Sequence, residues 1–260
     1  MDLQLDGKRA IVTGGSLGLG KQIARALIEE GARVVIAARD HERLQRTAAE
    51  LGPAAIPVAC DTARDESVKA MVASAAQALG GIDILVNSAA RPGGGSAPPK
   101  LAELNDELFW EDVNVKVMGY LRCIREAVPH MGTGARIINI SGLAARWTGS
   151  TIGSIRNIAV AAMTKNLADE LGARGISVVV VHPGTVRTER TPTEVRLRME
   201  QTGRSEAEVL SDMARRNVLG RLIDSSEVAS VVAFLCSPRA IAINGDAVAV
   251  GGGIPGSIFY

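Results

Sequence analysis

The feature that most constrains this chain is a regular alternation of short apolar runs, rich in β-branched residues, with longer amphipathic stretches. Several runs are apolar throughout, as expected for parallel strands buried on both faces. The intervening stretches have helical spacing, and Gly31 and Gly80 stand at the ends of two of them, where helices stop. The alternation predicts right-handed crossovers and an α/β fold, a doubly wound parallel sheet of about seven strands with helices on both faces. Strands are expected at Arg9–Thr13, Arg33–Ala38, Ala55–Ala59, Asp83–Asn87, Arg136–Ile140, Ile176–His182 and Ala247–Val250, and helices include Leu19–Glu30, Glu42–Leu51 and Glu66–Leu79.

Length, charge and cysteine content narrow the class of protein. The 260 residues are enough for one large α/β domain that spans residues 1–260, and length alone would also allow two small domains. Lys and Arg number 29 against 28 Asp and Glu, and this balance argues against nucleic acid or an anionic membrane as partner. An odd set of three widely spaced cysteines predicts buried reduced thiols and no metal site. With no signal-peptide pattern and no apolar run of membrane-spanning length, a cytoplasmic location is expected.

Three irregular stretches, 91–100, 142–151 and 184–204, come directly after the carboxyl ends of expected strands. Open α/β sheets bind ligands at this edge. Together with residues 205–217, the last stretch predicts a helical flap at about 185–220, which either covers a substrate or packs there without a catalytic role. None of the three stretches carries a recognisable ligand code, so the substrate is expected to be a small molecule of unknown identity.

A glycine-rich turn, Thr13-Gly14-Gly15-Ser16-Leu17-Gly18-Leu19-Gly20, comes after the first expected strand and leads directly into a helix. Glycines let the backbone turn sharply and approach a pyrophosphate, while the helix N-terminus offers unpaired N–H groups and a partial positive charge. The segment up to Lys21 also approaches a nucleotide-triphosphate loop, but Gln22 stands where a magnesium-binding Ser or Thr is needed. The turn therefore predicts a bound dinucleotide.

The spacing of this turn resembles that of the short-chain dehydrogenase/reductase family, and further motifs extend the resemblance over nearly the whole chain. These motifs are Asp61, Asn87-Ser88-Ala89-Ala90, Pro183-Gly184 with Thr188, and the closing segment from Asn244 to Gly252. The resemblance implies a Rossmann-type fold and an NAD(P)-dependent oxidoreductase that transfers hydride to or from a carbonyl or alcohol. It implies cofactor contacts from Thr13, Gly14, Ser16, Leu17, Gly18, Leu19, Gly20, Arg39, Asp61, Thr62, Asn87, Ala89, Asn157, Pro183, Gly184, Val186 and Thr188.

The end of the second expected strand bears on the choice between NAD and NADP. Ala38 stands where an NAD-preferring relative often has an aspartate for the ribose 2′-hydroxyl, and Arg39 is the next residue. A guanidinium can pair with a 2′-phosphate, so NADP is favoured over NAD. The alternative is that Arg39 is a solvated arginine without a cofactor contact.

The catalytic pattern that the resemblance implies is a serine, a tyrosine and a lysine four residues after the tyrosine, with Asn114 as the active-site asparagine. Counted along this chain, the serine position falls on Gly142, with Ser141 one residue earlier. The tyrosine falls on Gly153 and the lysine on Asn157, and a frame shifted by one residue gives Ile152 and Arg156. The usual acid is therefore missing in either frame.

Only Tyr120 and Tyr260 carry a phenol anywhere in the chain. Tyr120 is expected to pack in a long helix or at a subunit contact. Tyr260 could reach a site only if the C-terminus folded back or crossed to a neighbouring subunit. Two functions remain open: an oxidoreductase with a non-standard proton donor, and a catalytically weak or inert dinucleotide-binding protein that acts as sensor or partner subunit. The candidate catalytic residues are Asn114, Ser141, Asn157 and Arg156, and proximity adds Ser154 and Lys116 as substitute donors.

The resemblance also implies a homodimer or homotetramer that associates through the long helical segments 107–131 and 152–171. Both segments contain enough apolar residues to form such an interface. In the second, helical spacing predicts a buried stripe made of Ile155, Ile158, Ala162, Leu167 and Leu171.

Overall fold

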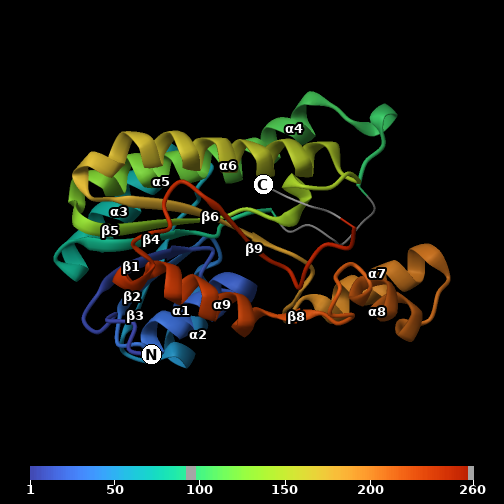
Figure 1. Ribbon diagram of the computed structural model, residues 1–260, viewed down its shortest axis with the longest axis horizontal. Helices are drawn as coiled ribbons and strands as arrows, with labels where there is room; N and C mark the ends of the chain where they lie inside the picture. The colour runs from blue at the N-terminus through green and yellow to red at the C-terminus, as the bar shows by residue number, and fades with distance from the viewer. Residues whose placement is uncertain (92–97, 257–260) are drawn as a thin grey trace.

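The computed structural model describes residues 1–91 and 98–256, and within them seven parallel strands form one sheet (Figure 1). All seven predicted strands are confirmed, with ends that move by at most five residues, at Met131. The sheet order is β3 (Ala55–Ala59), β2 (Arg33–Ala38), β1 (Arg9–Thr13), β4 (Ile82–Asn87), β5 (Met131–Ile140), β6 (Ser177–Pro183) and β9 (Ala247–Val250).

The strand order reverses between β1 and β4. From β1 the chain proceeds outward to β2 and β3, and it then returns to β4 and proceeds outward in the other direction. The loops that leave β1 and β4 therefore diverge and open a crevice at the carboxyl edge of the sheet. The crevice lies at the predicted ligand-binding edge.

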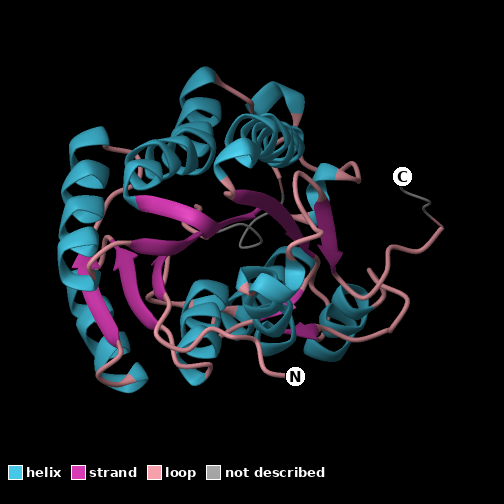
Figure 2. Ribbon diagram, turned by 60° about the vertical axis from the view of Figure 1, so that its left-hand side comes forward, coloured by secondary structure: helices cyan, strands magenta, loops and turns pink. Residues whose placement is uncertain are grey.

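Helices cover both faces of the sheet (Figure 2), as predicted. Neighbouring residues of one strand enter different core clusters: Val34 and Ile36 pack on one side, and Val35 and Ala37 on the other. This two-sided burial explains why the strands are apolar throughout. One layer holds α1 (Gly18–Glu29), α2 (His41–Leu51) and α9 (Ser225–Cys236), and the other holds α3 (Asp65–Leu79), α4 (Asp106–Val113), α5 (Gly119–Ala127) and α6 (Thr151–Leu171).

The predicted buried stripe of α6 is wrong at three of its five positions: Ala162 is exposed, as are Ile155 and Ile158, whereas Leu171 is buried and Leu167 half-buried. Ile155 and Ile158 are 44% and 52% exposed. The face of the helix that packs inward instead carries Gly153, Asn157 and Thr164 beside apolar residues. The pattern of apolar residues therefore indicated the wrong face of the helix as the buried one. The inner face borders a polar site, and large apolar side chains lie on the outer face.

Residues near 185–220 form a separate helical element at the edge of the molecule (Figure 1). It contains α7 (Thr191–Thr202) and α8 (Glu206–Ala214), and it is attached through a parallel pair of two-residue strands, β7 (Val186–Arg187) and β8 (Ile223–Asp224). A small apolar cluster of its own holds it together, made by Val195, Val209, Met213 and Leu222. We call this element the flap.

Part of the irregular stretch 91–100, residues 92–97, lies outside the described residues, as does Tyr260. Among the described helices, none is long and apolar enough to cross a membrane. The three cysteines are buried and unpaired in the structure, as their spacing predicts.

Candidate active site

The glycine turn after β1 depends on close backbone packing. Gly14 and Gly18 have φ of 68° and 57°, in the left-handed region that favours glycine. A Cβ on Gly20 would lie 2.3 Å from the carbonyl oxygen of Gly14, so only glycine fits there. The turn thus brings the N-terminus of α1 directly against the crevice, with its amides exposed to a ligand.

One of these amides already binds a carboxylate in the structure. The backbone N–H of Gly18 donates a hydrogen bond of 3.1 Å to a carboxylate oxygen of Glu189, a residue at the entrance to the flap. A helix N-terminus favours negative charge through its dipole and its unpaired N–H groups. The carboxylate stands in chemically for a phosphate, so the turn fits the pyrophosphate of a dinucleotide.

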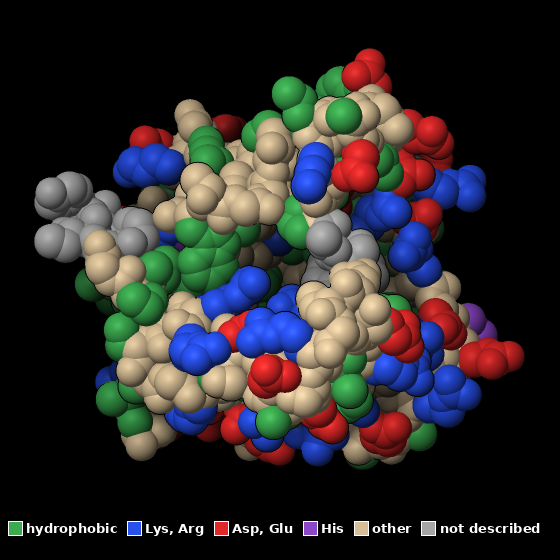
Figure 3. Space-filling view, turned by 90° about the vertical axis from the view of Figure 1, so that its right-hand side faces the viewer, with side chains coloured by type: hydrophobic (Ala, Val, Ile, Leu, Met, Phe, Trp, Pro, Cys, Tyr) green, Lys and Arg blue, Asp and Glu red, His purple; other side chains and the backbone are tan. Residues whose placement is uncertain are grey.

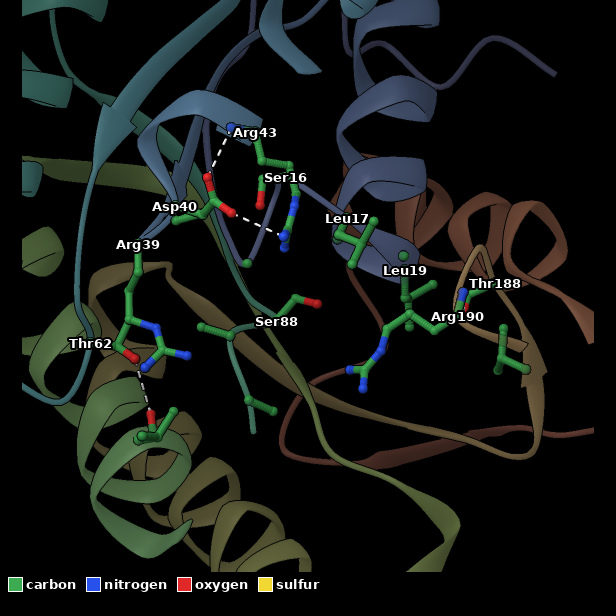
Figure 4. Close-up of a pocket in the computed structure, with 18 of the residues that line it drawn as sticks. Ser16, Leu17, Leu19, Arg39, Asp40, Arg43, Thr62, Ser88, Thr188 and Arg190 are labelled. Carbon is green, nitrogen blue, oxygen red and sulfur yellow. Dashed lines mark hydrogen bonds and ion pairs between the residues drawn. The ribbon is translucent and has the colours of Figure 1, made fainter. Parts of the chain in front are cut away.

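A cavity of about 860 Å³ begins at this turn (Figure 4). It extends from α1 along the ends of β2 and β4 to the flap. Most of the predicted cofactor residues line it, namely Gly14, Ser16, Leu17, Gly18, Leu19, Gly20, Arg39, Thr62, Ala89, Gly184, Val186 and Thr188.

Two predicted cofactor residues support the wall of this cavity from behind. The hydroxyl oxygen of Thr13 accepts hydrogen bonds from the N–H groups of Ser88 and Ala89, at 3.1 and 3.2 Å. The side-chain amide of Asn87 donates to Asn139 at 2.9 Å and is fully buried. Thr13 thereby fixes the loop after β4, Asn87 joins the ends of β4 and β5, and neither residue lines the cavity.

The remaining three predicted cofactor residues also lie outside this cavity. Asp61 uses its carboxylate to accept from the N–H of Ala63 at 3.1 Å, which holds the loop after β3. Pro183 and Asn157 line a second cavity instead.

Arg39 and Arg43 give the cavity a positive end (Figure 4). Arg43 forms an ion pair of 2.9 Å with Asp40, whereas Arg39 forms no ion pair with any described residue. Because its charge is not neutralised, Arg39 remains available to an anionic group of a ligand. Among the described residues, the sequence-based interpretation did not include Arg190 and Arg198 of the flap, which also line this cavity.

The second cavity measures about 770 Å³ and lies beside the first, at the ends of β5 and β6 and against α6. Several residues line both cavities, including Leu19, Gly184 and Arg198, so the two are contiguous. Figure 3 looks onto a hollow on this face of the molecule, with Lys and Arg side chains along its lower rim. A ligand in the second cavity would therefore lie next to one in the first.

Two predicted catalytic positions carry no side chain in this cavity. Gly142 and Gly153 both line it. The neighbouring hydroxyl, that of Ser141, donates to the backbone oxygen of Asn157 at 3.0 Å and is buried. Ser141 therefore holds α6 against β5.

The predicted role of Asn114 is not supported by its position. Asn114 lines neither cavity; its side chain donates to the backbone oxygen of Ala63 at 3.3 Å and accepts from Arg122 at 2.8 Å. It begins a π-helical turn, Asn114–Met118, between α4 and α5. A π-helical turn contains an additional residue and so rotates the next part of the helix about its axis. In this structure Lys116 is the residue of the turn that lines the second cavity.

Lys116 is 4% exposed and makes two hydrogen bonds through its amine. Nζ donates to Oδ1 of Asn157 at 2.9 Å and to the backbone oxygen of Ser141 at 3.0 Å. Burial, reinforced by the charge of Arg156, lowers the pKa of this amine to about 7. Its sequence signal was a single charge between Val115 and Val117, in an otherwise apolar turn.

Other polar groups near this cavity are already engaged. The phenol of Tyr120, fully buried, donates to the backbone oxygen of Ile140 at 2.9 Å, and burial raises its pKa. Tyr120 is thus a packed residue, as predicted. Arg156 forms an ion pair of 2.5 Å with Asp112. In the described part of the chain, no cluster of three acidic, histidine or cysteine side chains is arranged to hold a metal ion.

Comparisons with known proteins agree with this geometry. A family model described as enoyl-(acyl carrier protein) reductase matches residues 14–255. A putative ketoacyl reductase of Streptomyces coelicolor is 35% identical over 264 aligned residues, covering 96% of this chain and 97% of the relative.

Two solved structures extend the comparison. L-sorbose reductase of Gluconobacter frateurii, complexed with NADPH and L-sorbose, superposes with a TM-score of 0.91 at 32% identity, covering 99% of this chain and 100% of that one. An actinorhodin polyketide ketoreductase with NADPH gives a TM-score of 0.87 at 34% identity, covering 96% and 98%. The fold, the glycine turn and these relatives agree: this chain belongs to the short-chain dehydrogenase/reductase family.

Proposed function

We propose that this protein is an NADPH-dependent oxidoreductase that reduces the carbonyl group of a small molecule with a proton donor other than tyrosine. The observation that carries the proposal is the contact between the two cavities. A dinucleotide-fitting cavity opens onto a second one that contains a buried amine, that of Lys116, and no available phenol among the described residues.

The residues of the first cavity suit the parts of NADPH. The amides at the start of α1 would bind the pyrophosphate, and Arg39 would pair with the 2′-phosphate. When bound, the cofactor supplies a hydride to the carbonyl carbon. The L-sorbose reductase and the actinorhodin ketoreductase are both complexed with NADPH, which supports this cofactor, although a 3-ketoacyl reductase of Brucella melitensis is complexed with NADH. Arg39 is therefore the main argument for NADPH.

A second function, dinucleotide binding with little or no turnover, is favoured by one observation. The hydroxyl of Ser141 and the phenol of Tyr120 are both bonded to backbone oxygens, and Gly142 and Gly153 have no reactive side chain. A protein with these groups alone would hold the cofactor as a sensor or partner subunit. The amine of Lys116 distinguishes the two functions.

The test separates binding from turnover. NADPH and NADH affinities are measured by titration calorimetry, and oxidation of either cofactor is monitored against a panel of ketones, enones, imines and thioesters of 3-keto acids. We expect NADPH to bind more tightly than NADH and at least one carbonyl class to be reduced. Binding without turnover across the panel would instead support the sensor or partner-subunit function, and absence of binding to both nucleotides would overturn both.

We further propose that the protein is a homodimer or homotetramer that associates through α4 and α6. Large apolar side chains are exposed on this layer: Trp110 at 61%, Ile155 at 44% and Ile158 at 52%. Apolar residues at helical spacing on one face are typical of interfaces. In light scattering, Ile158→Glu should lower the assembled mass, whereas Ile241→Glu, at an exposed position elsewhere, should not; equal masses for all three proteins would refute the interface.

A further inference from the structure

On the basis of the proposed function, we propose that Nζ of Lys116 is the group that donates a proton to the substrate's carbonyl oxygen. The acid would then come from the π-helical turn before α5, and α6 would contribute only Asn157 to hold it in place. This assigns a catalytic role to a residue that the tyrosine-based pattern does not contain.

The contacts of Lys116 leave one donor for a ligand. A protonated amine has three N–H groups. Two of them are directed by Oδ1 of Asn157 and by the backbone oxygen of Ser141, and these two acceptors come from α6 and from the end of β5. Since Lys116 lines the second cavity, the third N–H is available to an oxygen atom placed there. The amine is thus positioned as well as buried.

Compared with the pattern that the family resemblance implies, the lysine and the asparagine of this site have exchanged places between two helical elements. The family resemblance implies an asparagine in the helix before β5 and a lysine in α6. The structure has Lys116 and Asn157 facing the cavity from these elements, in contact with each other at 2.9 Å. The site therefore retains one amine and one amide but presents the positive charge from the opposite wall.

The glycines provide the space that this arrangement needs. Gly142 and Gly153 line the same cavity as Lys116, and neither projects a side chain between the amine and the cavity. A lysine amine on a long side chain can donate directly to a substrate only if no bulky group stands between them.

The charged and titratable groups around Lys116 leave the amine close to its midpoint at neutral pH. Arg156 of α6 opposes its charge and Asp112 of α4 favours it, while burial is the largest effect and brings the pKa to about 7. His182 of β6 is held neutral at this pH, because burial and the charges of Arg146 and Lys116 lower its pKa to about 4. Tyr120, one turn along, stays neutral too, because burial raises its pKa. An acid with a pKa near the working pH is the most effective general acid.

The proton transfer balances without any further reactant. As the hydride reaches the carbonyl carbon, an N–H bond of the Lys116 ammonium breaks and an O–H bond forms on the former carbonyl oxygen. The products are an alcohol, the oxidised nicotinamide and a neutral amine, which regains its proton from water that enters the cavity. In the direction of alcohol oxidation the neutral amine accepts the proton instead.

The other candidate donors fit this role less well. The guanidinium of Arg156 is paired with Asp112 and so is already engaged as a donor. The hydroxyl of Ser141 donates to backbone, and that of Ser154 donates to the backbone oxygen of Trp147 at 3.2 Å. Lys116 is the candidate that combines an exchangeable proton with a position on the cavity.

The experiment compares the wild type with Lys116→Met, Lys116→Arg and the control Lys165→Met, whose parent side chain is exposed and forms an ion pair with Asp169. Three properties are measured: the Kd for NADPH, the pH profile of kcat for a reduced carbonyl from the panel, and the titration of each amine by ¹³Cε-lysine NMR. Lys116→Met identifies the Lys116 signal by its disappearance. The NMR readout does not depend on turnover, and thermal unfolding establishes that every variant is folded.

We expect one lysine signal to titrate near pH 7 and to be missing in Lys116→Met. In that variant and in Lys116→Arg, kcat should fall by about 100- to 10,000-fold, while the Kd for NADPH changes less than about threefold. The wild-type rate of reduction should fall above pH 7. The residual activity of both variants should not show this decline. Lys165→Met should match the wild type in all three measurements.

If Lys116→Met keeps the wild-type kcat and pH profile, the inference is overturned and the proposed function stays intact. A Lys116 amine that titrates above pH 9 would have the same consequence. A purely structural lysine would change stability and the Kd together, without removing the decline above pH 7. Failure of the wild type to reduce any carbonyl while it binds NADPH would overturn the proposed function, and the inference with it.

Discussion

The first cavity, the cofactor half of this site, uses backbone groups, whereas the second cavity, its catalytic half, uses side chains. Around Gly14, Gly18 and Gly20 the ligand-binding groups are backbone amides, and the sequence specifies them by the absence of side chains. In the second cavity the chemistry depends on two side chains, Lys116 and Asn157, on separate elements. A backbone cradle tolerates almost no change, whereas a site made of side chains can exchange its residues and keep its charge. The comparison explains how one half resembles the family closely while the other departs from it.

The largest change in the affinity for NADPH should come from adding a single methyl group in the cofactor half. Gly20→Ala places a Cβ 2.3 Å from the carbonyl oxygen of Gly14, and relief of this clash must open the turn. We expect the Kd for NADPH to rise about 100-fold, equivalent to ~3 kcal/mol. Calorimetric titration measures it, with Gly132→Ala as control because nothing lies within 4 Å of a Cβ there. Unchanged binding by a folded Gly20→Ala would show that the dinucleotide does not use this cradle.

Arg39 tests whether the cofactor half also discriminates by charge. Arg39→Ala should weaken NADPH by about 10- to 100-fold, because a charged hydrogen bond is worth roughly 1.5–3 kcal/mol, and it should leave NADH unaffected. Parallel titrations with both nucleotides measure the ratio. Arg46→Ala, at an exposed position on α2, is the matched control. Equal loss for the two nucleotides would mean that Arg39 does not contact the 2′-phosphate.

His182 gives the catalytic half a pH-dependent stability. Its pKa in the folded protein is about 4, whereas an unfolded histidine titrates near 6.5. Between these values the unfolded chain binds a proton that the folded protein does not, so the free energy of unfolding should fall as the pH drops from 6.5 to 4 and be unaffected by this group above 6.5. Urea unfolding at several pH values should show a shallower decline for His182→Gln than for the wild type. Parallel declines would contradict the assignment.

Glu189 should have the smallest effect of the four, and in the opposite direction. Its carboxylate accepts from the N–H of Gly18 and must leave before a phosphate can bind there. Glu189→Gln removes the competing charge, and since a charge at a helix N-terminus is worth about 0.3–1 kcal/mol, NADPH should bind roughly two- to fivefold more tightly. Glu200→Gln, at an exposed position on α7, serves as control. Weaker binding in Glu189→Gln would mean that the carboxylate assists the cofactor.

The same contrast explains what could be predicted from the sequence. Strand and helix positions could be located from apolar runs and from glycines, because burial on both faces of a sheet leaves a direct pattern in the chain. The glycine turn could also be predicted from the sequence, because its function depends on local backbone geometry. Twelve of the predicted cofactor residues line the first cavity.

Side-chain positions in the catalytic half were less predictable. The family resemblance selected Asn114, but the π-helical turn at Asn114–Met118 rotates the chain and brings Lys116 to the cavity. No local sequence motif marks such a turn, which contacts α6 as well as the two helices that it joins. For the same reason the outward orientation of Ile155 and Ile158 was missed: a helix beside a polar site places its apolar residues where a partner would meet them.

Arg198 lines both cavities, and it reaches them from a flap with its own small core. The first ligand to bind orders Arg198 and offsets its charge. The second ligand then binds without that free-energy cost. Cofactor and substrate should therefore bind cooperatively, and thermodynamic reciprocity requires each to raise the affinity of the other by the same factor.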